Sequence, residues 1–204
     1  MISLYLIRHG DSTAIGKFLS GRAAGVTLTP KGITEVQALA NLLSDFRLDA
    51  IYSSPMERTV DTARAIRHLC SNEIQVEPAI NEVDFGEWTG LTFDQLHHNP
   101  DWKQWFTTRS SAYAPGGETM KGVQDRMVKF LQSLENKHPD GHVAVVSHGD
   151  VIRAALCHFF QTSLDAIDHF DIDTASVTLV EVGRDFWRVR YLNLTGMLFD
   201  KQSQ

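Results

Sequence analysis

The chain has 204 residues, 43% of them hydrophobic and 22% charged, and its formal net charge at pH 7 is −6. This length and composition predict one globular domain over residues 1–204, because no composition shift or Gly/Ser-rich linker divides the chain. A net negative charge without basic clusters argues against a nucleic-acid-binding protein. An anionic substrate would therefore need a locally basic site.

Neither membrane insertion nor secretion is predicted. The apolar run over residues 2–7 is too short for a membrane span or a signal sequence and meets Arg8 at once. The two cysteines, Cys70 and Cys157, fall in expected helices and give neither a disulfide framework nor a zinc-binding spacing. We expect a cytoplasmic protein with no membrane partner, and the pattern leaves its oligomeric state open.

The first third of the chain predicts two buried strands, each followed by a helix. Continuous apolar runs over residues 2–8 and 48–53 are typical of strands covered on both faces. Thr29 and Pro30 predict the N-cap and first position of a helix that reaches Leu43. A second helix is predicted over residues 56–69. The apolar positions of the first helix recur at helical spacing and are Ile33, Val36, Leu39, Ala40 and Leu43.

The middle of the chain predicts a cap over one edge of the sheet. Residues 93–118 are a candidate cap insertion in which part of the chain is helical, and a further helix is expected over residues 119–134. Aromatic side chains at this spacing more often pack together than bind a substrate, although such a cap would favour a partly apolar leaving group. The aromatic residues are Phe93, Trp102, Trp105, Phe106 and Tyr113.

The last third predicts a strand over residues 143–147, a helix over 150–160, and strands over 176–182 and 186–194. The connection Gly183-Arg184-Asp185 is so short that the last two strands must pair antiparallel. The elements together predict an α/β fold. We expect a three-layer α/β/α sandwich with a mostly parallel central sheet, one antiparallel strand and a small helical cap.

Two of the predicted strands end in histidines, in Arg8-His9-Gly10 and in Ser147-His148-Gly149. Open α/β sheets bind ligands at the carboxyl ends of their strands, so the two histidines are expected to meet there. Arg58 follows another strand and could bind two anion oxygens with its guanidinium fork. Each residue alone also fits a structural role; the combination favours a functional site.

Neighbouring residues in a strand point to opposite faces of the sheet. Arg8 and His9 can therefore face the same ligand only if the backbone leaves regular strand geometry between them. Gly10 would permit the close turn that this requires.

Downstream lies Asn81-Glu82-Val83-Asp84-Phe85-Gly86-Glu87. Together with Arg8-His9-Gly10, Ser147-His148-Gly149 and the segment Ser53-Ser54-Pro55-Met56-Glu57-Arg58, this makes four motifs in the expected order. On these motifs the chain resembles the histidine phosphatase superfamily, the phosphoglycerate mutase-like proteins, from the first strand to about residue 195. The resemblance is to the small phosphatase branch. It implies that His9 is transiently phosphorylated, that the phosphoryl group is clamped by Arg8, Arg58 and His148, and that Glu82 protonates the leaving group. On physical grounds alone, Asp84 and Glu87 compete with Glu82 for the acid role.

Candidate substrate-binding residues are Arg22, Ser12, Gly21 and Gly149. Arg22 could hold a second anionic group of the substrate, and an exposed loop arginine explains it equally well. The remaining histidines lack metal-ligand spacing, so neither a metal nor a cofactor is expected.

The sequence thus predicts a metal-independent phosphomonoesterase that hydrolyses a small phosphorylated metabolite through a phosphohistidine on His9. The alternatives are a phosphoglycerate mutase and a non-catalytic module that binds a phosphorylated ligand. Ile15 stands where the mutases carry an asparagine, and the segment between Glu82 and His148 is shorter than theirs and contains Pro115-Gly116-Gly117-Glu118, as in the phosphatases. The complete set of motifs disfavours a binding module. The pattern does not choose the substrate.

Overall fold

A computed structural model describes residues 1–184 and 186–196 of the protein. Asp185 of the expected turn and residues 197–204 of the expected domain lie outside the described residues. Six strands form one sheet in the order β3-β2-β4-β1-β5-β6. Their bounds are β1 Ile2–Arg8, β2 Ala50–Ser53, β3 Gln75–Val76, β4 His142–Ser147, β5 Val177–Gly183 and β6 Phe186–Leu194.

The sheet is mostly parallel. Strands β3, β2, β4 and β1 pair in parallel, whereas β5 pairs antiparallel with both β1 and β6. Among the described strands, β5 therefore runs against the others, and the predicted sheet with one antiparallel strand is confirmed.

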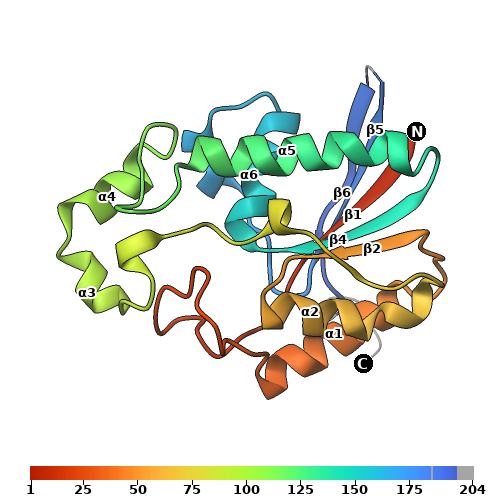
Figure 1. The fold of residues 1–204 in the computed structure, drawn as a ribbon, viewed down its shortest axis with the longest axis horizontal. Helices are drawn as coiled ribbons and strands as arrows, with labels where there is room; N and C mark the ends of the chain where they lie inside the picture. The colour runs from red at the N-terminus through yellow and green to blue at the C-terminus, as the bar shows by residue number, and fades with distance from the viewer. Residues whose placement is uncertain (185, 197–204) are drawn as a thin grey trace, which may run out of the picture.

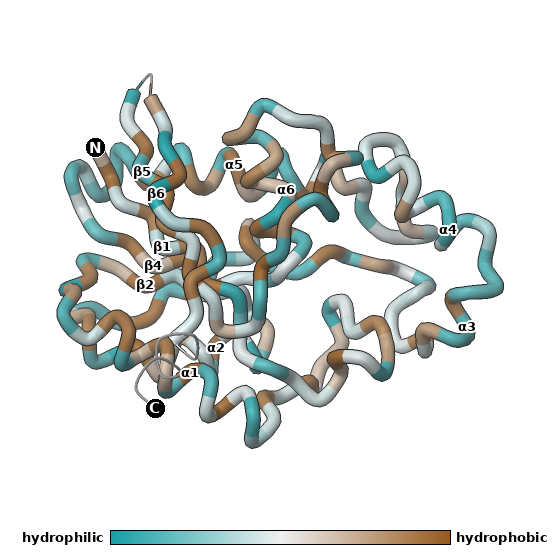
Figure 2. The backbone as a smooth tube through the Cα atoms, turned by 180° about the vertical axis from the view of Figure 1, so that it is seen from behind, coloured by the Kyte–Doolittle hydropathy of each residue, from teal (hydrophilic) through white to brown (hydrophobic). Residues whose placement is uncertain are grey.

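Helices cover both faces of the sheet, with α5 and α6 on one face and α1 and α2 on the other (Figure 1). Side chains of β1 alternate between two buried clusters: Leu4 and Leu6 pack in one, Tyr5 and Ile7 in the other. Hydrophobic residues accordingly concentrate along the central strands (Figure 2). The α-helices are α1 Pro30–Leu42, α2 Glu57–Ala65, α3 Phe93–His97, α4 Pro100–Thr107, α5 Met120–Lys137 and α6 Gly149–Phe159. Short 3₁₀ helices are η1 Arg67–Leu69, η2 Pro78–Ile80, η3 Gly86–Trp88 and η4 Leu164–His169.

Helix α1 begins as predicted, since Pro30 is its first residue and the Thr29 hydroxyl accepts the Gly32 N–H at 3.0 Å. The sequence pattern places Ile33 on the buried face of this helix. That prediction is wrong, because the Ile33 side chain is 49% exposed. The helix instead turns Gly32 and Glu35 inward, because this side packs on the polar loop after β1 rather than on apolar core. The Glu35 carboxylate accepts the Asp11 N–H at 2.8 Å.

The helix expected over residues 56–69 is divided. Helix α2 ends at Ala65 and the 3₁₀ helix η1 follows. Cys70 is therefore not helical; it forms an isolated bridge with Leu48. Strand β3 is not among the predicted strands, because its two residues, Gln75 and Val76, are exposed and form too short a run to show a strand pattern.

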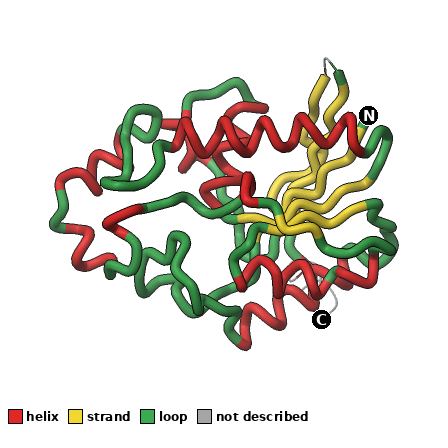
Figure 3. Tube along the Cα trace, viewed as in Figure 1, coloured by secondary structure: helices red, strands yellow, loops and turns green. Residues whose placement is uncertain are grey.

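The expected cap is built from α3 and α4, joined by loops at the end of the molecule away from β5 and β6 (Figure 3). Trp102 and Trp105 are buried and lie edge-on to Trp88, with ring centroids 5.3 and 5.8 Å apart. These two residues pack, as the spacing favours, whereas Phe93 and Phe106 are exposed. No helix in the described part of the chain is long and apolar enough to cross a membrane.

Candidate active site

His9 follows the last residue of β1, and its orientation is fixed on both sides of the ring. Its backbone N–H donates to the Ser147 carbonyl, and its Nδ1 lies 2.7 Å from the Gly10 carbonyl oxygen. A carbonyl can only accept, so Nδ1 carries the proton. The other ring nitrogen, Nε2, accepts a hydrogen bond from Arg58 Nε at 3.2 Å. His9 therefore presents a nitrogen lone pair.

Gly10 does not form the tight turn that was expected of it; a glycine is needed there because a neighbouring helix lies too close for a side chain. Its φ is not in the left-handed region. A Cβ at this position would lie 2.8 Å from both the Gly32 carbonyl oxygen and Val36 Cγ1 of α1. The glycine thus allows α1 to approach the loop that carries His9.

Arg58 sits in the first turn of α2, fully buried, at the centre of the site. Its Nη2 donates to the Gly21 carbonyl at 2.9 Å and lies 3.3 Å from His148 Nδ1. The same Nη2 is 3.6 Å from Glu82 Oε2. Its Nη1 is buried and has no hydrogen-bond partner among the described residues. An unpartnered guanidinium N–H of this kind is suited to an incoming anion.

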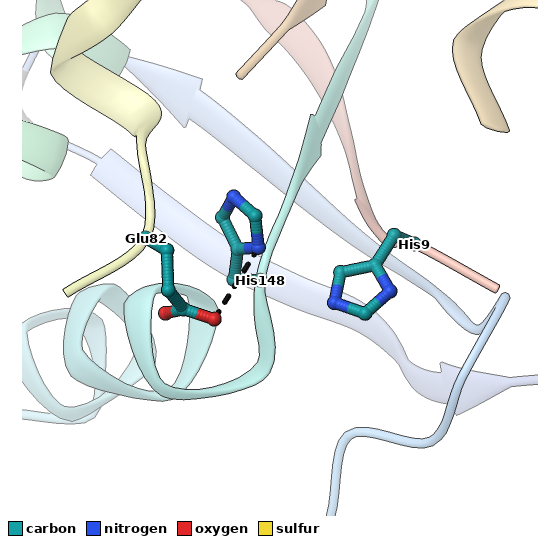
Figure 4. Close-up of side chains that lie close together, drawn as sticks. All are labelled: His9, Glu82 and His148. Atoms are coloured by element: carbon teal, nitrogen blue, oxygen red, sulfur yellow. Dashed lines mark ion pairs between the residues drawn. The ribbon is translucent and has the colours of Figure 1, made fainter. Parts of the chain in front are cut away.

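His148 directly follows β4 and is the N-cap residue of α6, and it is fully buried. Its Nε2 lies 2.8 Å from the Ser54 hydroxyl, and its Nδ1 is 3.3 Å from Glu82 Oε2. The carboxylate of Glu82 points at this ring, and the ring of His9 lies across from both (Figure 4). The centroids of the two imidazole rings are 5.3 Å apart.

Glu82 lies in the loop after η2, and its main chain is held from two sides. Its carbonyl oxygen accepts from Arg22 Nε at 2.9 Å and from Arg126 Nη2 at 3.1 Å. The competing carboxylates are placed differently: Asp84 accepts the Gly86 N–H, and Glu87 is exposed. Of these three acids, Glu82 alone lines the cavity described below.

Burial sets the charge states of the three central groups. Burial, followed by the positive charges of Arg58 and Arg8, lowers the pKa of His9 well below its usual value. Burial and Arg58 lower the pKa of His148 in the same way. Burial raises the pKa of Glu82, against the opposing charge of Arg58. Relative to the same groups in water, the site therefore shifts both imidazoles toward the neutral form and the carboxyl group toward the protonated form.

A cavity of 290 Å³ opens above these residues. It is lined by the candidates Arg8, His9, Ser12, Gly21, Glu82 and Gly149. Arg58 and His148 are not part of the lining but contact residues that are: Arg58 bonds to His9 and Gly21, and His148 Nδ1 lies 3.3 Å from Glu82 Oε2. Arg22 is not brought to the cavity, because its guanidinium instead binds the Glu82 carbonyl and pairs with Asp84 and Glu118.

The outer end of the cavity contains residues that sequence reasoning missed, namely Arg109, Asp150, Arg153 and Asp168. Arg109 comes from the cap, is 3% exposed, and pairs with Asp150 at 3.2 Å and with Asp168 at 3.7 Å. Its guanidinium also lies over the Phe106 ring at 4.7 Å. Asp150 could have been found from its place next to His148-Gly149; Arg109 and Asp168 carry no such signal.

The ligand atoms of His9, Glu82 and His148 lie within 4.8 Å of one another, a spacing that could hold a metal ion. Arg58 contacts all three residues, however. A fixed guanidinium charge at that point repels a cation and attracts an anion. The arrangement is therefore better suited to a phosphoryl group than to a metal.

Comparison with known proteins agrees with this geometry. Residues 4–195 match the family model of the histidine phosphatase superfamily (branch 1). Phosphoserine phosphatase 1 of Hydrogenobacter thermophilus is 30% identical over 96% of this chain and 93% of its own. The adenosylcobalamin/alpha-ribazole phosphatase of Escherichia coli is 28% identical over 93% of this chain and 95% of its own. Relatives named as 2,3-bisphosphoglycerate-dependent phosphoglycerate mutases also match.

Among solved structures, Bacillus stearothermophilus YhfR superimposes with a TM-score of 0.87 at 27% identity, covering 95% of this chain and 97% of that one. The chain belongs to the histidine phosphatase superfamily. The enzyme class expected from its motifs, a phosphatase, is confirmed by these relatives.

Proposed function

We propose that the protein is a metal-independent phosphomonoesterase that hydrolyses a small phosphorylated metabolite through a phosphohistidine on His9. The observation that carries this proposal is the pairing of the His9 Nε2 lone pair with a buried arginine that still has an unused N–H. A nucleophile beside an unsatisfied cation is what transfer of a phosphoryl group requires.

In the first step, Arg58 and Arg8 bind the phosphoryl oxygens and His9 Nε2 attacks phosphorus. The new N–P bond forms as the P–O bond to the leaving group breaks, and Glu82 gives its proton to the departing oxygen. In the second step, a water molecule transfers its proton to the Glu82 carboxylate and attacks phosphorus. The N–P bond breaks, inorganic phosphate leaves, and Glu82 is again protonated.

The organic part of the substrate would occupy the outer cavity under the cap, which we propose is an insertion over residues 93–118. Ile15, Phe93 and Phe106 offer apolar surface there, and Arg109 and Arg153 offer charge. The cavity volume restricts the substrate to a small molecule. A cytoplasmic location and the absence of nucleic-acid and membrane partners stay predictions of the sequence.

Ile15 favours hydrolysis over mutase chemistry. It lines the cavity and is 40% exposed. A mutase, by the family resemblance, has an asparagine at this position, and isoleucine offers no hydrogen bond to a phosphoglycerate.

The test is phosphate release from p-nitrophenyl phosphate in the presence of a chelator. Wild type should release phosphate at a rate that the chelator does not change, and His9→Ala should lose turnover. His97→Ala, in the cap outside the cavity, is the matched control and should keep it. Release that depends on an added metal ion, or full activity of His9→Ala, would contradict the proposal. Conversion of 3-phosphoglycerate without phosphate release would identify a mutase, and ligand binding retained by both variants without any turnover would identify a binding module.

A further inference from the structure

Behind His148, on the Nε2 side of its ring, lie two buried polar side chains without an assigned role, Ser54 and Asn81. Ser54 Oγ lies 2.8 Å from His148 Nε2 and 3.1 Å from Asn81 Oδ1. Ser54 is fully buried and Asn81 is 9% exposed. Water therefore does not replace these hydrogen bonds, and each hydrogen must be assigned to one partner.

The direction of the chain follows from one unambiguous donor. The backbone N–H of Glu82 donates to Asn81 Oδ1 at 2.8 Å, which fixes the orientation of the Asn81 amide. Ser54 has a single hydroxyl hydrogen. If that hydrogen pointed at His148, Ser54 Oγ and Asn81 Oδ1 would face each other as two acceptors inside the protein. The hydroxyl therefore donates to Asn81 and can only accept from His148.

We propose that Ser54 and Asn81 are positioning residues that hold His148 as the Nε2–H tautomer, so that its Nδ1 lone pair faces Arg58 and Glu82. His9 is held as the opposite tautomer, with the proton on Nδ1 against the Gly10 carbonyl. Both histidines thus direct a lone pair at the same guanidinium, through Arg58 Nε and Nη2.

This arrangement matters for the proposed phosphatase reaction, on which its functional part rests. A bound phosphoryl group favours a cationic His148, which would donate from Nδ1 to a phosphoryl oxygen. Ser54 can accept from Nε2–H in the neutral and in the cationic state alike. The opposite orientation of the hydroxyl would be compatible with the neutral state only, because imidazolium has no lone pair. The hydroxyl direction set by Asn81 therefore leaves His148 free to gain the proton.

The direct test is nitrogen NMR of the histidine rings in the unliganded wild-type protein, at a pH where both rings are neutral. The nitrogen shifts and the couplings to the ring C–H protons identify which nitrogen is protonated, and His148→Gln and His9→Gln assign the signals by their absence. We expect Nε2–H for His148 and Nδ1–H for His9. Nδ1–H at His148 would overturn the proposal, and this readout does not depend on turnover.

Variants then test the role of the chain. Ser54→Ala removes the acceptor, and Asn81→Ala frees the Ser54 hydroxyl to donate to His148. Both should shift His148 toward the Nδ1–H tautomer and lower kcat/KM by about 10-fold, the effect of one buried hydrogen bond. Ser54→Thr, which keeps the hydroxyl, should restore the tautomer.

Ser53→Ala is the matched control. Ser53 is equally buried and adjacent, but its hydroxyl donates to the Ser54 carbonyl and does not touch His148. It should leave the His148 tautomer unchanged. An unchanged tautomer in Ser54→Ala, or an equal shift in Ser53→Ala, would overturn the positioning role. The expected tautomers in a protein that releases no phosphate would support the hydrogen-bond assignment and contradict the proposed function instead.

Discussion

At the scale of single residues, Arg58 determines what the neighbouring groups can do. One guanidinium donates to His9 and His148 and lies beside Glu82. Burial and this charge lower the pKa of both histidines, whereas burial raises the pKa of Glu82 against the opposing charge of Arg58. The proposed nucleophile, His9, and the proposed acid, Glu82, are thus both shifted toward the forms that the proposed reaction needs.

The pH dependence follows from these directions. His9 has a lowered pKa, so it loses its lone pair only when the pH falls below the range of an ordinary histidine. Glu82 has a raised pKa, so it keeps its proton above the range of an ordinary glutamate and loses it as the pH rises further. For a substrate with a poor leaving group, kcat/KM should fall on the acid side with His9 and on the alkaline side with Glu82.

Glu82→Gln tests the second limb. With an alkyl phosphomonoester, whose leaving oxygen needs a proton, the variant should lose roughly 10²–10⁴ in kcat/KM and the alkaline limb that belongs to Glu82. With p-nitrophenyl phosphate, whose leaving group departs as a stable anion, the loss should be much smaller. Steady-state kinetics over a pH series with both substrates measures the difference. Glu87→Gln, exposed and outside the cavity, is the control; an equal loss on both substrates would assign Glu82 a role other than the acid.

At the scale of elements, α1 supports the nucleophile loop without contributing a side chain to the cavity. A Cβ on Gly32 would lie 2.1 Å from the Asp11 carbonyl oxygen, a contact that only movement of the helix or the loop can relieve. The Glu35 carboxylate and the Thr29 hydroxyl also bond to Asp11. The loop after His9 is thus fixed by the backbone of this helix.

Gly32→Ala should displace the loop and destabilise the protein by about 1–3 kcal/mol, the usual result of overpacking. It should also lower kcat, because His9 lies two residues before Asp11. Denaturant unfolding and phosphatase kinetics measure the two effects. Thr34→Ala, on the exposed side of the same helix, should leave both near wild type. An unchanged stability of Gly32→Ala would show that α1 does not constrain the loop.

The elements that could be predicted are those with a strong local signal. Strands β1 and β4 are continuous apolar runs, and Thr29-Pro30 fixes the start of α1. The predicted burial of Ile33 is wrong because hydrophobic periodicity assumes apolar neighbours along the whole helix. Val36 and Leu39 do meet the apolar core, but Gly32 and Glu35 face the polar loop after β1. Strand β3 has two exposed residues and gains its pairing only from β2.

At the scale of the whole molecule, the proposed anion site lies in a chain of net charge −6. Arg8 lines the cavity, and the fully buried Arg58 bonds to His9 and Gly21 of its lining. Local positive charge with little solvent screening binds an anion in spite of the overall negative charge.

Inorganic phosphate should therefore stabilise the fold. At a concentration of 100 times its Kd, a ligand of the native state adds about 2.7 kcal/mol to the free energy of unfolding. A thermal shift with and without phosphate measures this increment. Arg58→Met should lose it, whereas Arg64→Met, on the exposed side of the same helix, should keep it. An increment retained by Arg58→Met would place the phosphate elsewhere.

The site residues that could be predicted are those at the ends of strands or in a family motif, such as His9 and His148. The residues that support them were not. Ser54 lies 94 positions from His148 in the chain, and Arg126 lies 44 positions from Glu82. Such contacts depend on how the chain folds, and the spacing of residue types along it gives no sign of them.

The central claim is that His9 carries the phosphoryl group between the two steps. Rapid acid-free quenching of the enzyme with a phosphomonoester, followed by peptide mass spectrometry, measures it directly. The account predicts one additional phosphoryl group on the peptide that contains His9, labile to acid and stable to base. With p-nitrophenyl phosphate, whose leaving group needs no proton, Glu82→Gln should carry more of it than wild type, because its second step lacks the base. Steady phosphate release without any phosphorylated His9 at any time point would contradict it.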